Sequence, residues 1–154
     1  AKHSFFDAPE VRKQMDEKTR KAFSHFGGYV RKSARNSIKQ ASGSRDHSTE
    51  GNPPKSHNRL LKDFIFYAFD KAQRSVVIGA ARLSKPMNRG KTVPQLLEEG
   101  GMARYSSNIL KGKHHIRVRG EKQTSFRLGP RPYMKPAFDG AIKHLPEIWQ
   151  RFSG

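Results

Sequence analysis

A long amphipathic pattern near the N-terminus places the strongest constraint on how this chain folds. Apolar residues recur at three- and four-residue spacing from Val11 to Ala41, and lysines and arginines occupy the opposite face. Asp7 and Glu10 have the spacing of a capping box, which predicts the start of a helix. The pattern predicts a helical segment over residues 1–41, containing one helix of about 33 residues and about 50 Å. That length exceeds the diameter of a compact domain of this size, so we expect part of the helix to project.

Two adjacent glycines, Gly27 and Gly28, interrupt this pattern. Each glycine costs about 1 kcal/mol relative to alanine in a helix interior. We therefore expect either a kink or a break into two helices at this point.

The composition limits the size of the core. A chain of 154 residues fits a single domain, here residues 1–154. Its hydrophobic content of 34% is low for a compact globule, which predicts one small core and a large solvated or partner-covered remainder. The chain has no cysteine, which excludes disulfides and thiolate chemistry. No apolar run approaches the roughly 20 residues needed to cross a bilayer, and we expect no membrane partner.

The chain is strongly basic. Its 31 lysines and arginines against 13 acidic residues give a formal net charge of +18. The density is highest between Arg104 and Lys135, where Glu121 is the single acid. Such a field attracts phosphate or an acidic protein surface and is screened by salt. Nucleic-acid contact, an acidic protein neighbour and a merely solvated surface all remain open.

The remaining pattern predicts a loop, several strands and two further helices. A Ser-, Gly- and Pro-rich composition indicates a flexible loop over residues 42–57. The β-branched and aromatic residues 62–69 and 75–80 predict an antiparallel hairpin with both faces of its first strand buried. Further strands are expected at residues 113–119 and 124–128, and a Thr92-capped helix at 93–99 is expected to stop at Gly100-Gly101. The predicted class is therefore α/β (α+β), with an antiparallel sheet of about four strands, in segment 58–154, packed against the long N-terminal helix and a C-terminal helix.

The C-terminal segment predicts a helix that docks on the rest of the chain. An extended lead through Arg131, Pro132 and Met134 precedes a helix opening at Pro136, where a missing N–H costs nothing. An apolar stripe then reaches Phe152 and includes Trp149, the only tryptophan. We expect Trp149 to be buried where this helix docks.

The sequence offers no constellation suited to catalysis or metal binding. His114 and His115 are adjacent, so on a strand they face opposite sides and cannot share one ion. His47 and His57 lie in the polar loop with no second cluster at zinc-like spacing. The chain also lacks a nucleophile elbow and a phosphate-binding glycine loop. We therefore expect no catalytic, cofactor-binding or metal-binding residue and no enzymatic activity.

A basic stripe is expected on the predicted strand at residues 113–119. Lys113, Arg117 and Arg119 alternate there with apolar or histidine positions. They fit either an ordinary half-buried strand with its cations outward, or a basic surface lining a channel or facing a neighbouring ring.

The order of several short motifs resembles one known family. These motifs are GNPPKSH at residues 51–57, LLKDFI at 60–65, SVVIG at 75–79, VPQLLEEGG at 93–101 and RPYMKPA at 131–137. Together they resemble the neck and tail-completion proteins of tailed bacteriophages, the head–tail joining or tail-terminator family, including versions in Mu-like prophages. The similarity covers roughly residues 22–152. It departs from the commoner pattern at Asn58-Arg59, where a glycine is typical, and in its high net charge.

The resemblance implies a structural virion protein assembled in the host cytoplasm. Its subunits would form a homo-oligomeric ring, usually a hexamer, that caps the tail tube and meets the head connector, with non-specific contact to passing double-stranded DNA. A stopper or adaptor ring of the same neck and a small basic nucleic-acid-binding module are the alternatives. The resemblance implies an interface loop (Gly51, Pro53, Pro54, His57), a turn beside the sheet (Pro94, Glu98, Gly100, Gly101) and the entry to the docking helix (Arg131, Pro132, Met134, Pro136). Trp149 of that helix and the basic stripe (Lys113, Arg117, Arg119) come from the residue pattern described above.

Overall fold

A computed structural model describes residues 8–43, 45–57, 59–81, 91–106 and 123–153. In chain order its elements are α1 (Ala8–Ser37), β1 (Lys39–Gln40), β2 (Lys55–Ser56), α2 (Leu60–Asp63), β3 (Ile65–Asp70), β4 (Ser75–Ala80), α3 (Val93–Glu99), β5 (Gly101–Ser106), β6 (Gln123–Leu128), α4 (Met134–Ile142) and α5 (Leu145–Ser153). The class is mixed helix and strand, broadly α+β, as predicted.

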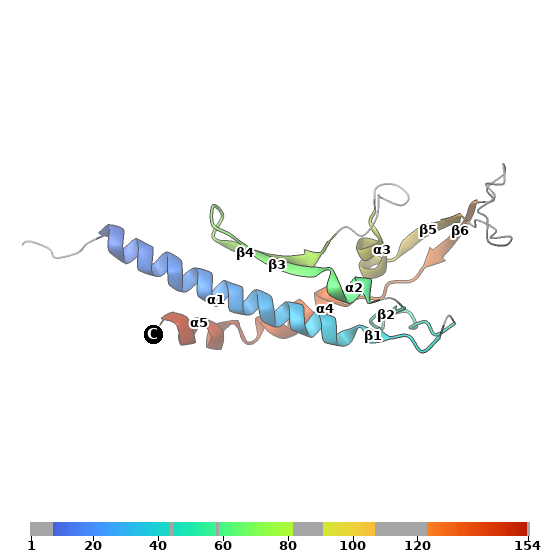
Figure 1. The fold of residues 1–154 in the computed structure, drawn as a ribbon, viewed down its shortest axis with the longest axis horizontal. Coiled ribbons are helices and arrows are strands. Elements are labelled where there is room, and N and C mark those ends of the chain that lie inside the picture. The colour runs from blue at the N-terminus through green and yellow to red at the C-terminus, as the bar shows by residue number, and fades with distance from the viewer. Residues whose placement is uncertain (1–7, 44, 58, 82–90, 107–122, 154) are drawn as a thin grey trace, which may run out of the picture.

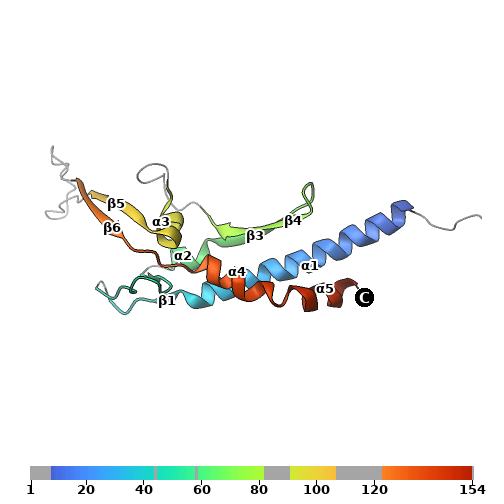
Figure 2. The same ribbon diagram turned by 180° about the vertical axis from the view of Figure 1, so that it is seen from behind.

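The molecule is elongated, and α1 lies along its long axis (Figure 1). The β3–β4 hairpin runs along one side of α1, and α4 and α5 run along the other (Figures 1 and 2). The β5–β6 hairpin projects at the end of the molecule that lies away from the start of α1. The long helix is therefore the support on which both the first hairpin and the C-terminal helices pack.

Helix α1 begins at Ala8, directly after the predicted capping residue. Its 30 residues span about 45 Å, slightly less than predicted, because the helix ends at Ser37. Strand β1 (Lys39–Gln40) follows and pairs in parallel with β2 (Lys55–Ser56). The predicted projection is present: the start of α1 extends past α5 and past the turn of the β3–β4 hairpin (Figure 1).

Helix α1 is continuous through Gly27 and Gly28, so the break, one of the two predicted alternatives, does not occur. Gly27 instead makes room for the hairpin. A Cβ added at Gly27 would lie 2.7 Å from Cδ2 of Tyr67 and 2.9 Å from Cγ2 of Val76. Gly27 therefore allows β3 and β4 to approach the helix backbone closely, which offsets its low helix propensity.

One small core holds the elements together, in agreement with the low apolar content. It consists of one stripe of α1 that continues to Ile38, one buried residue each from α2, β3, α5 and the lead into α4, and two from α4: Ala22, Phe26, Val30, Ala34, Ile38, Leu61, Ile65, Tyr133, Ala137, Ala141 and Ile148. Val76, Ile78 and Ala80 of β4 pack against its edge. The helical spacing of the α1 residues is the direct cause of this arrangement.

The predicted single sheet of about four strands is not confirmed. The described strands form three separate two-stranded sheets, β1–β2, β3–β4 and β5–β6. The predicted hairpin is present, although its first strand starts at Ile65 because residues 60–63 form α2. The strand expected at residues 124–128 is β6, and its partner β5 was not predicted. The strand expected at residues 113–119 lies outside the described residues.

The C-terminal segment forms two helices where one was predicted. Helix α4 starts at Met134, two residues before Pro136, and α5 starts at Leu145. Pro136 lies in the first turn of α4, where its missing N–H is tolerated. Pro146 cannot donate a hydrogen bond to the carbonyl of Ile142, which accounts for the interruption between the two helices.

Candidate functional site

The predicted turn residue Glu98 caps the start of α4. Its carboxylate accepts hydrogen bonds from the backbone N–H groups of Tyr133 (3.0 Å), Met134 (3.1 Å) and Lys135 (2.7 Å). Pro136 follows and has no N–H to satisfy. The carboxylate thus satisfies the free donors of the first turn and places a negative charge at the positive end of the helix dipole.

Tyr133 is buried beside this carboxylate. Its side chain is 1% exposed, and its hydroxyl has no hydrogen-bond partner among the described residues. Burial, followed by the negative charge of Glu98, raises the pKa of Tyr133 above its ordinary value. Tyr133 therefore remains a neutral core residue at physiological pH.

The other predicted turn residues shape the connection from α3 to β5. Thr92 and Gln95 form the capping box of α3, and Pro94 is buried in its first turn. Gly100 has a φ of 72°, and a Cβ there would lie 2.9 Å from the carbonyl oxygen of Leu128. Both the left-handed conformation and the close approach require glycine at this position.

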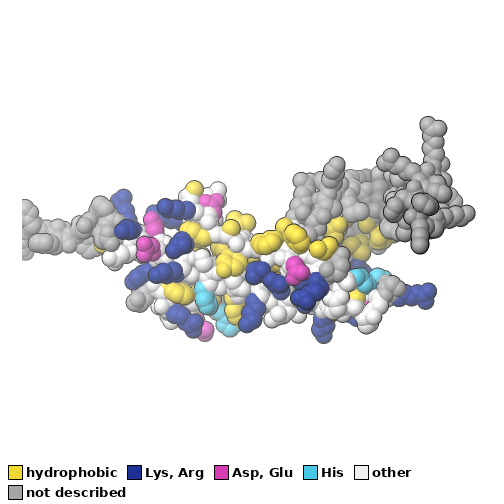
Figure 3. All heavy atoms as spheres, in the orientation of Figure 1, with side chains coloured by type: hydrophobic (Ala, Val, Ile, Leu, Met, Phe, Trp, Pro, Cys, Tyr) yellow, Lys and Arg dark blue, Asp and Glu magenta, His cyan; other side chains and the backbone are white. Residues whose placement is uncertain are grey.

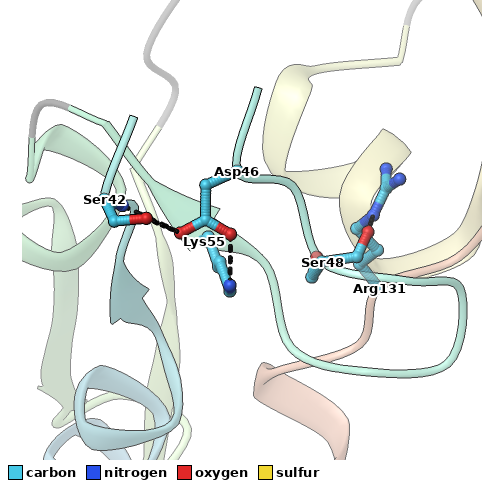
Figure 4. A network of polar contacts seen from close by, with 5 residues as sticks. All are labelled: Ser42, Asp46, Ser48, Lys55 and Arg131. Atoms are coloured by element: carbon cyan, nitrogen blue, oxygen red, sulfur yellow. Dashed lines mark hydrogen bonds and ion pairs between the residues drawn. The ribbon is translucent and has the colours of Figure 1, made fainter. Parts of the chain in front are cut away.

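The loop at residues 42–57 has its own polar network (Figure 4). Asp46 accepts hydrogen bonds from the Ser42 N–H (2.8 Å) and hydroxyl (2.9 Å) and forms an ion pair with Lys55. The Lys55 ammonium first, and then the Ser42 donors, hold the pKa of Asp46 well below its usual range. Asp46 thus joins the start of the loop to strand β2.

Two hydrogen bonds connect the same loop to the segment before α4. The Arg131 Nε donates to the carbonyl of Ser48 (2.9 Å; Figure 4), and the Gly51 N–H donates to the carbonyl of Pro130 (2.8 Å). The Arg131 N–H in turn donates to the carbonyl of Leu97 in α3 (2.6 Å). Arg131 is therefore bonded to both the loop and α3.

Residues of three predicted groups (Gly51; Glu98 and Gly100; Arg131) thus meet in one place together with Ser48 and Pro130. We call these six residues the junction: Ser48, Gly51, Glu98, Gly100, Pro130 and Arg131. The sequence placed them in separate motifs, and the structure brings them together through backbone hydrogen bonds. Their roles at the junction are to orient the loop, the end of β6 and the start of α4.

The predicted interface loop is only partly accessible. Gly51 and His57 are exposed, Pro53 is half-buried and Pro54 is buried within the chain. The His57 ring lies 5.4 Å from that of His47, in an edge-on arrangement. Of the four predicted residues, Gly51 and His57 are thus the most accessible to a partner.

The predicted docking helix is attached less deeply than expected. Trp149 is 39% exposed, although its ring lies 5.9 Å from that of Phe23 on α1. The neighbouring Ile148 is the buried residue of α5, at 6% exposure. The expectation of a buried tryptophan is therefore wrong, because α5 presents Ile148 to the core and Trp149 to its margin. Pro132 and Met134 are half-buried, and Pro136 is exposed.

The outer side of the β3–β4 hairpin is an apolar surface that the sequence analysis missed. Phe66 is 51% exposed and Val77 is 62% exposed, and Phe64 packs edge-on against Phe66 at 6.0 Å. With the exposed Ala68 they form what we call the outer face: Phe64, Phe66, Ala68 and Val77. Hydrophobic side chains are visible along this side of the molecule in Figure 3.

The alternation within β3 contained a signal for this surface. Ile65 and its paired residue Ala80 face α1. Phe66 and Ala68 lie on the opposite side of β3, and Val77, which is paired with Ala68, lies on that side of β4. Sequence reasoning took apolar residues on both sides to mean that both were buried. The single small core has only enough elements to cover one of them.

The basic stripe, a metal site and a membrane-spanning helix are the remaining subjects of the sequence analysis. The basic stripe Lys113, Arg117 and Arg119 lies outside the described residues. Within the described ranges, no three His, Asp or Glu side chains are grouped as a metal site would require. Over the same ranges, no helix is long and apolar enough to span a membrane.

Comparisons with protein-family models, with curated proteins and with solved structures give no match for this chain.

Proposed function

We propose that this chain is a structural subunit of the neck of a tailed bacteriophage, a tail-terminator-like protein whose copies form a ring between the tail tube and the head connector. The ordered series of motifs described above supports the family assignment. The outer face of the β3–β4 hairpin is the observation that carries the assembly role.

A partner that covered the outer face would gain free energy by burying its apolar side chains. Phe66 and Val77 are both more than half exposed, and burying an apolar side chain of this kind contributes about 1.5–3 kcal/mol. Among the described strands, neither edge of the β3–β4 hairpin has a neighbouring strand. A second subunit placed against this hairpin would cover apolar surface and satisfy edge donors and acceptors together.

The elongated shape favours a head-to-tail contact. The β3–β4 hairpin lies beside the middle of α1, whereas the β5–β6 hairpin projects at one end of the molecule (Figure 1). A contact between two different surfaces of identical chains is heterologous, and repeating it closes a ring when the rotation allows. Neck rings of tailed phages have this kind of rotational symmetry.

The roles found at the junction fit a structural protein. The Glu98 carboxylate, a group that can act as an acid or a base in enzymes, is here engaged as the cap of α4. Arg131 and Gly51 are engaged in bonds that fix the path of the chain. The motifs that carry the resemblance therefore have architectural tasks, which is consistent with a ring subunit that performs no chemistry.

A small nucleic-acid-binding module is the second candidate, and the exposed cations of α1 favour it. Arg12, Lys13, Lys18, Arg20 and Lys21 are all exposed on the first half of this helix. A monomer that binds duplex DNA tightly at physiological salt would support this alternative. Stopper and adaptor rings share the proposed assembly, and the position of the subunit in cryo-EM maps of assembled particles distinguishes them.

Mass photometry and negative-stain microscopy of the purified chain test the proposal. We expect discrete rings for the wild type and loss of rings in the double variant Phe66→Ser/Val77→Thr. Circular dichroism should show an unchanged fold, because both side chains point away from α1. Met15→Ser is the control, since it removes another exposed apolar side chain that lies on α1 and not on the outer face. A wild type that stays monomeric at all concentrations, with no incorporation into particles, would contradict the proposal.

A further inference from the structure

A charged cleft lies between the first half of α1 and the turn of the β3–β4 hairpin. It has a volume of about 790 Å³ and is lined by residues of both elements: Arg12, Lys13, Asp16, Glu17, Thr19, Arg20, Phe69, Lys71, Ala72 and Arg74. We call it the basic cleft. Figure 3 shows lysine and arginine side chains gathered over this end of the molecule, with a few acidic side chains among them.

The basic cleft carries excess positive charge. Its lining has five cations and two acids, a formal excess of three positive charges. Asp16 pairs with Arg74 at 3.2 Å, which connects the hairpin turn to the helix and neutralises that acid. Among the five cations, Arg74 alone has an ion-pair partner within the described part of the chain.

The hairpin turn is built to present its cations. The Asp70 carboxylate accepts hydrogen bonds from the N–H groups of Ala72 (2.9 Å) and Gln73 (3.1 Å), and Arg74 has a φ of 47°. This closed turn places Lys71 and Arg74 in the lining of the cleft. On the helix, Arg12, Asp16 and Arg20 are four residues apart and so lie along one face.

We infer that the basic cleft binds the phosphate backbone of double-stranded DNA. This inference rests on the proposed function, in which duplex DNA passes through the ring. Arg12 and Arg20 are about 12 Å apart along α1, which matches three to four base-pair steps of a duplex at about 3.4 Å each. Arginine forks and lysine ammonium groups are the usual partners of phosphate oxygens. A conduit for DNA needs this kind of sequence-independent attraction.

The lining favours a duplex over the other anionic partners. Seven of its ten residues carry a formal charge, whereas the centres of protein–protein interfaces are depleted in lysine and acidic residues. Interfaces with DNA are more polar and more positive. Phe69 is the single aromatic of the lining and is half-buried, so the cleft lacks the stacking platform that single-stranded bases require.

Fluorescence anisotropy with a short labelled DNA duplex and the full chain tests this inference. Binding should weaken steeply between about 50 and 200 mM salt. The double variant Arg20→Gln/Lys71→Gln removes two cations that have no ion-pair partner in the described chain. We expect it to lose about 10-fold or more in affinity at low salt and to reduce the slope of log K against log salt by about 1.8.

The control Lys32→Gln/Lys143→Gln makes the same change in net charge at exposed sites outside the cleft. It should leave the slope near the wild-type value. Equal losses from the two double variants would overturn the assignment to the basic cleft. Duplex binding too weak to measure at about 50 mM salt, or equally effective competition by polyglutamate at equal charge, would overturn the assignment to DNA.

Mass photometry of the same variants separates this inference from the proposed function. Rings that form normally but do not bind the duplex would refute the basic cleft alone. A chain that binds the duplex through the cleft but never forms rings would refute the ring proposal and leave the cleft assignment standing.

Discussion

The Glu98 carboxylate accepts a hydrogen bond from the backbone N–H of Tyr133, and so connects the end of α3 to the start of α4 across 35 positions of sequence. The same carboxylate also satisfies the N–H groups of Met134 and Lys135. One side chain therefore performs the task that a local capping residue performs in most helices. The beginning of α4 depends on a distant element for its first turn.

Loss of this cap should weaken the whole fold. We predict that Glu98→Ala lowers the free energy of unfolding by about 2 kcal/mol, because three donors lose a charged acceptor. Urea unfolding followed by circular dichroism measures the change. Glu99→Ala is the control: it removes an exposed ion pair with Lys91, which is worth about 1 kcal/mol or less. Similar losses for the two variants would contradict the capping role.

Two glycine substitutions in helices should have opposite effects. Gly27→Ala gains up to about 1 kcal/mol in helix propensity but forces the Tyr67 ring and Val76 to move, which costs about 1–3 kcal/mol. Gly140→Ala in α4 meets no atom within 4 Å and should stabilise the chain by about 0.5–1 kcal/mol. Thermal unfolding of both variants tests the pair. A stabilising Gly27→Ala would show that the hairpin does not pack closely on α1.

The two adjacent apolar residues of α5 should differ in importance. Ile148→Ala should cost about 3 kcal/mol, since this side chain is 6% exposed within the core. Trp149→Ala should cost less, about 1–2 kcal/mol, because 39% of the tryptophan remains in solvent. Chemical denaturation of the two variants gives the comparison. A larger loss at Trp149 would mean that a partner or a different helix orientation buries it.

The Asp46 network should make stability depend on pH in the acid range. Its pKa is lower in the folded chain than the ordinary value of 3.8, so the folded state binds fewer protons than the unfolded state there. The stabilising contribution is therefore present above the unfolded pKa and is lost as the pH falls below it. We predict a shallower decline in unfolding free energy between about pH 5 and 3 for Asp46→Asn than for the wild type. Parallel declines would contradict the role of this network.

Lys55→Gln provides a second test of the same network. The Lys55 ammonium is the largest cause of the low pKa of Asp46. Its removal should therefore flatten the acid dependence in the same direction as Asp46→Asn, while the Ser42 donors retain part of the effect. An unchanged acid dependence in Lys55→Gln would show that the ion pair has little influence on Asp46.

Local patterns along the sequence were sufficient for several elements. The apolar stripe located α1, and the Thr92 cap and the two glycines located α3 and its end. The β-branched runs located the hairpin, because strand and helix periodicities are local properties of the chain. The small size of the core followed from composition alone. The proposed family also came from the sequence, through the order of its motifs.

Relationships between distant residues depended on the tertiary structure. The cap formed by Glu98, the bonds of Arg131 to Ser48 and Leu97, and the packing of Tyr67 on Gly27 all join positions that no local pattern connects. Which face of the hairpin is buried was decided in the same way, since α1 can cover one side of β3–β4 and leaves Phe66 and Val77 on the other.

The sequence by itself thus determined the helical stripe, the turns, the scarcity of apolar residues and the excess of positive charge, because these depend on neighbouring residues or on simple sums. The tertiary structure alone decided which glycine makes room for a ring, which acid caps a helix, and which cations line a common cleft. These outcomes depend on the three-dimensional packing of separate elements around one small core, where burial on one side leaves an apolar surface uncovered on the other.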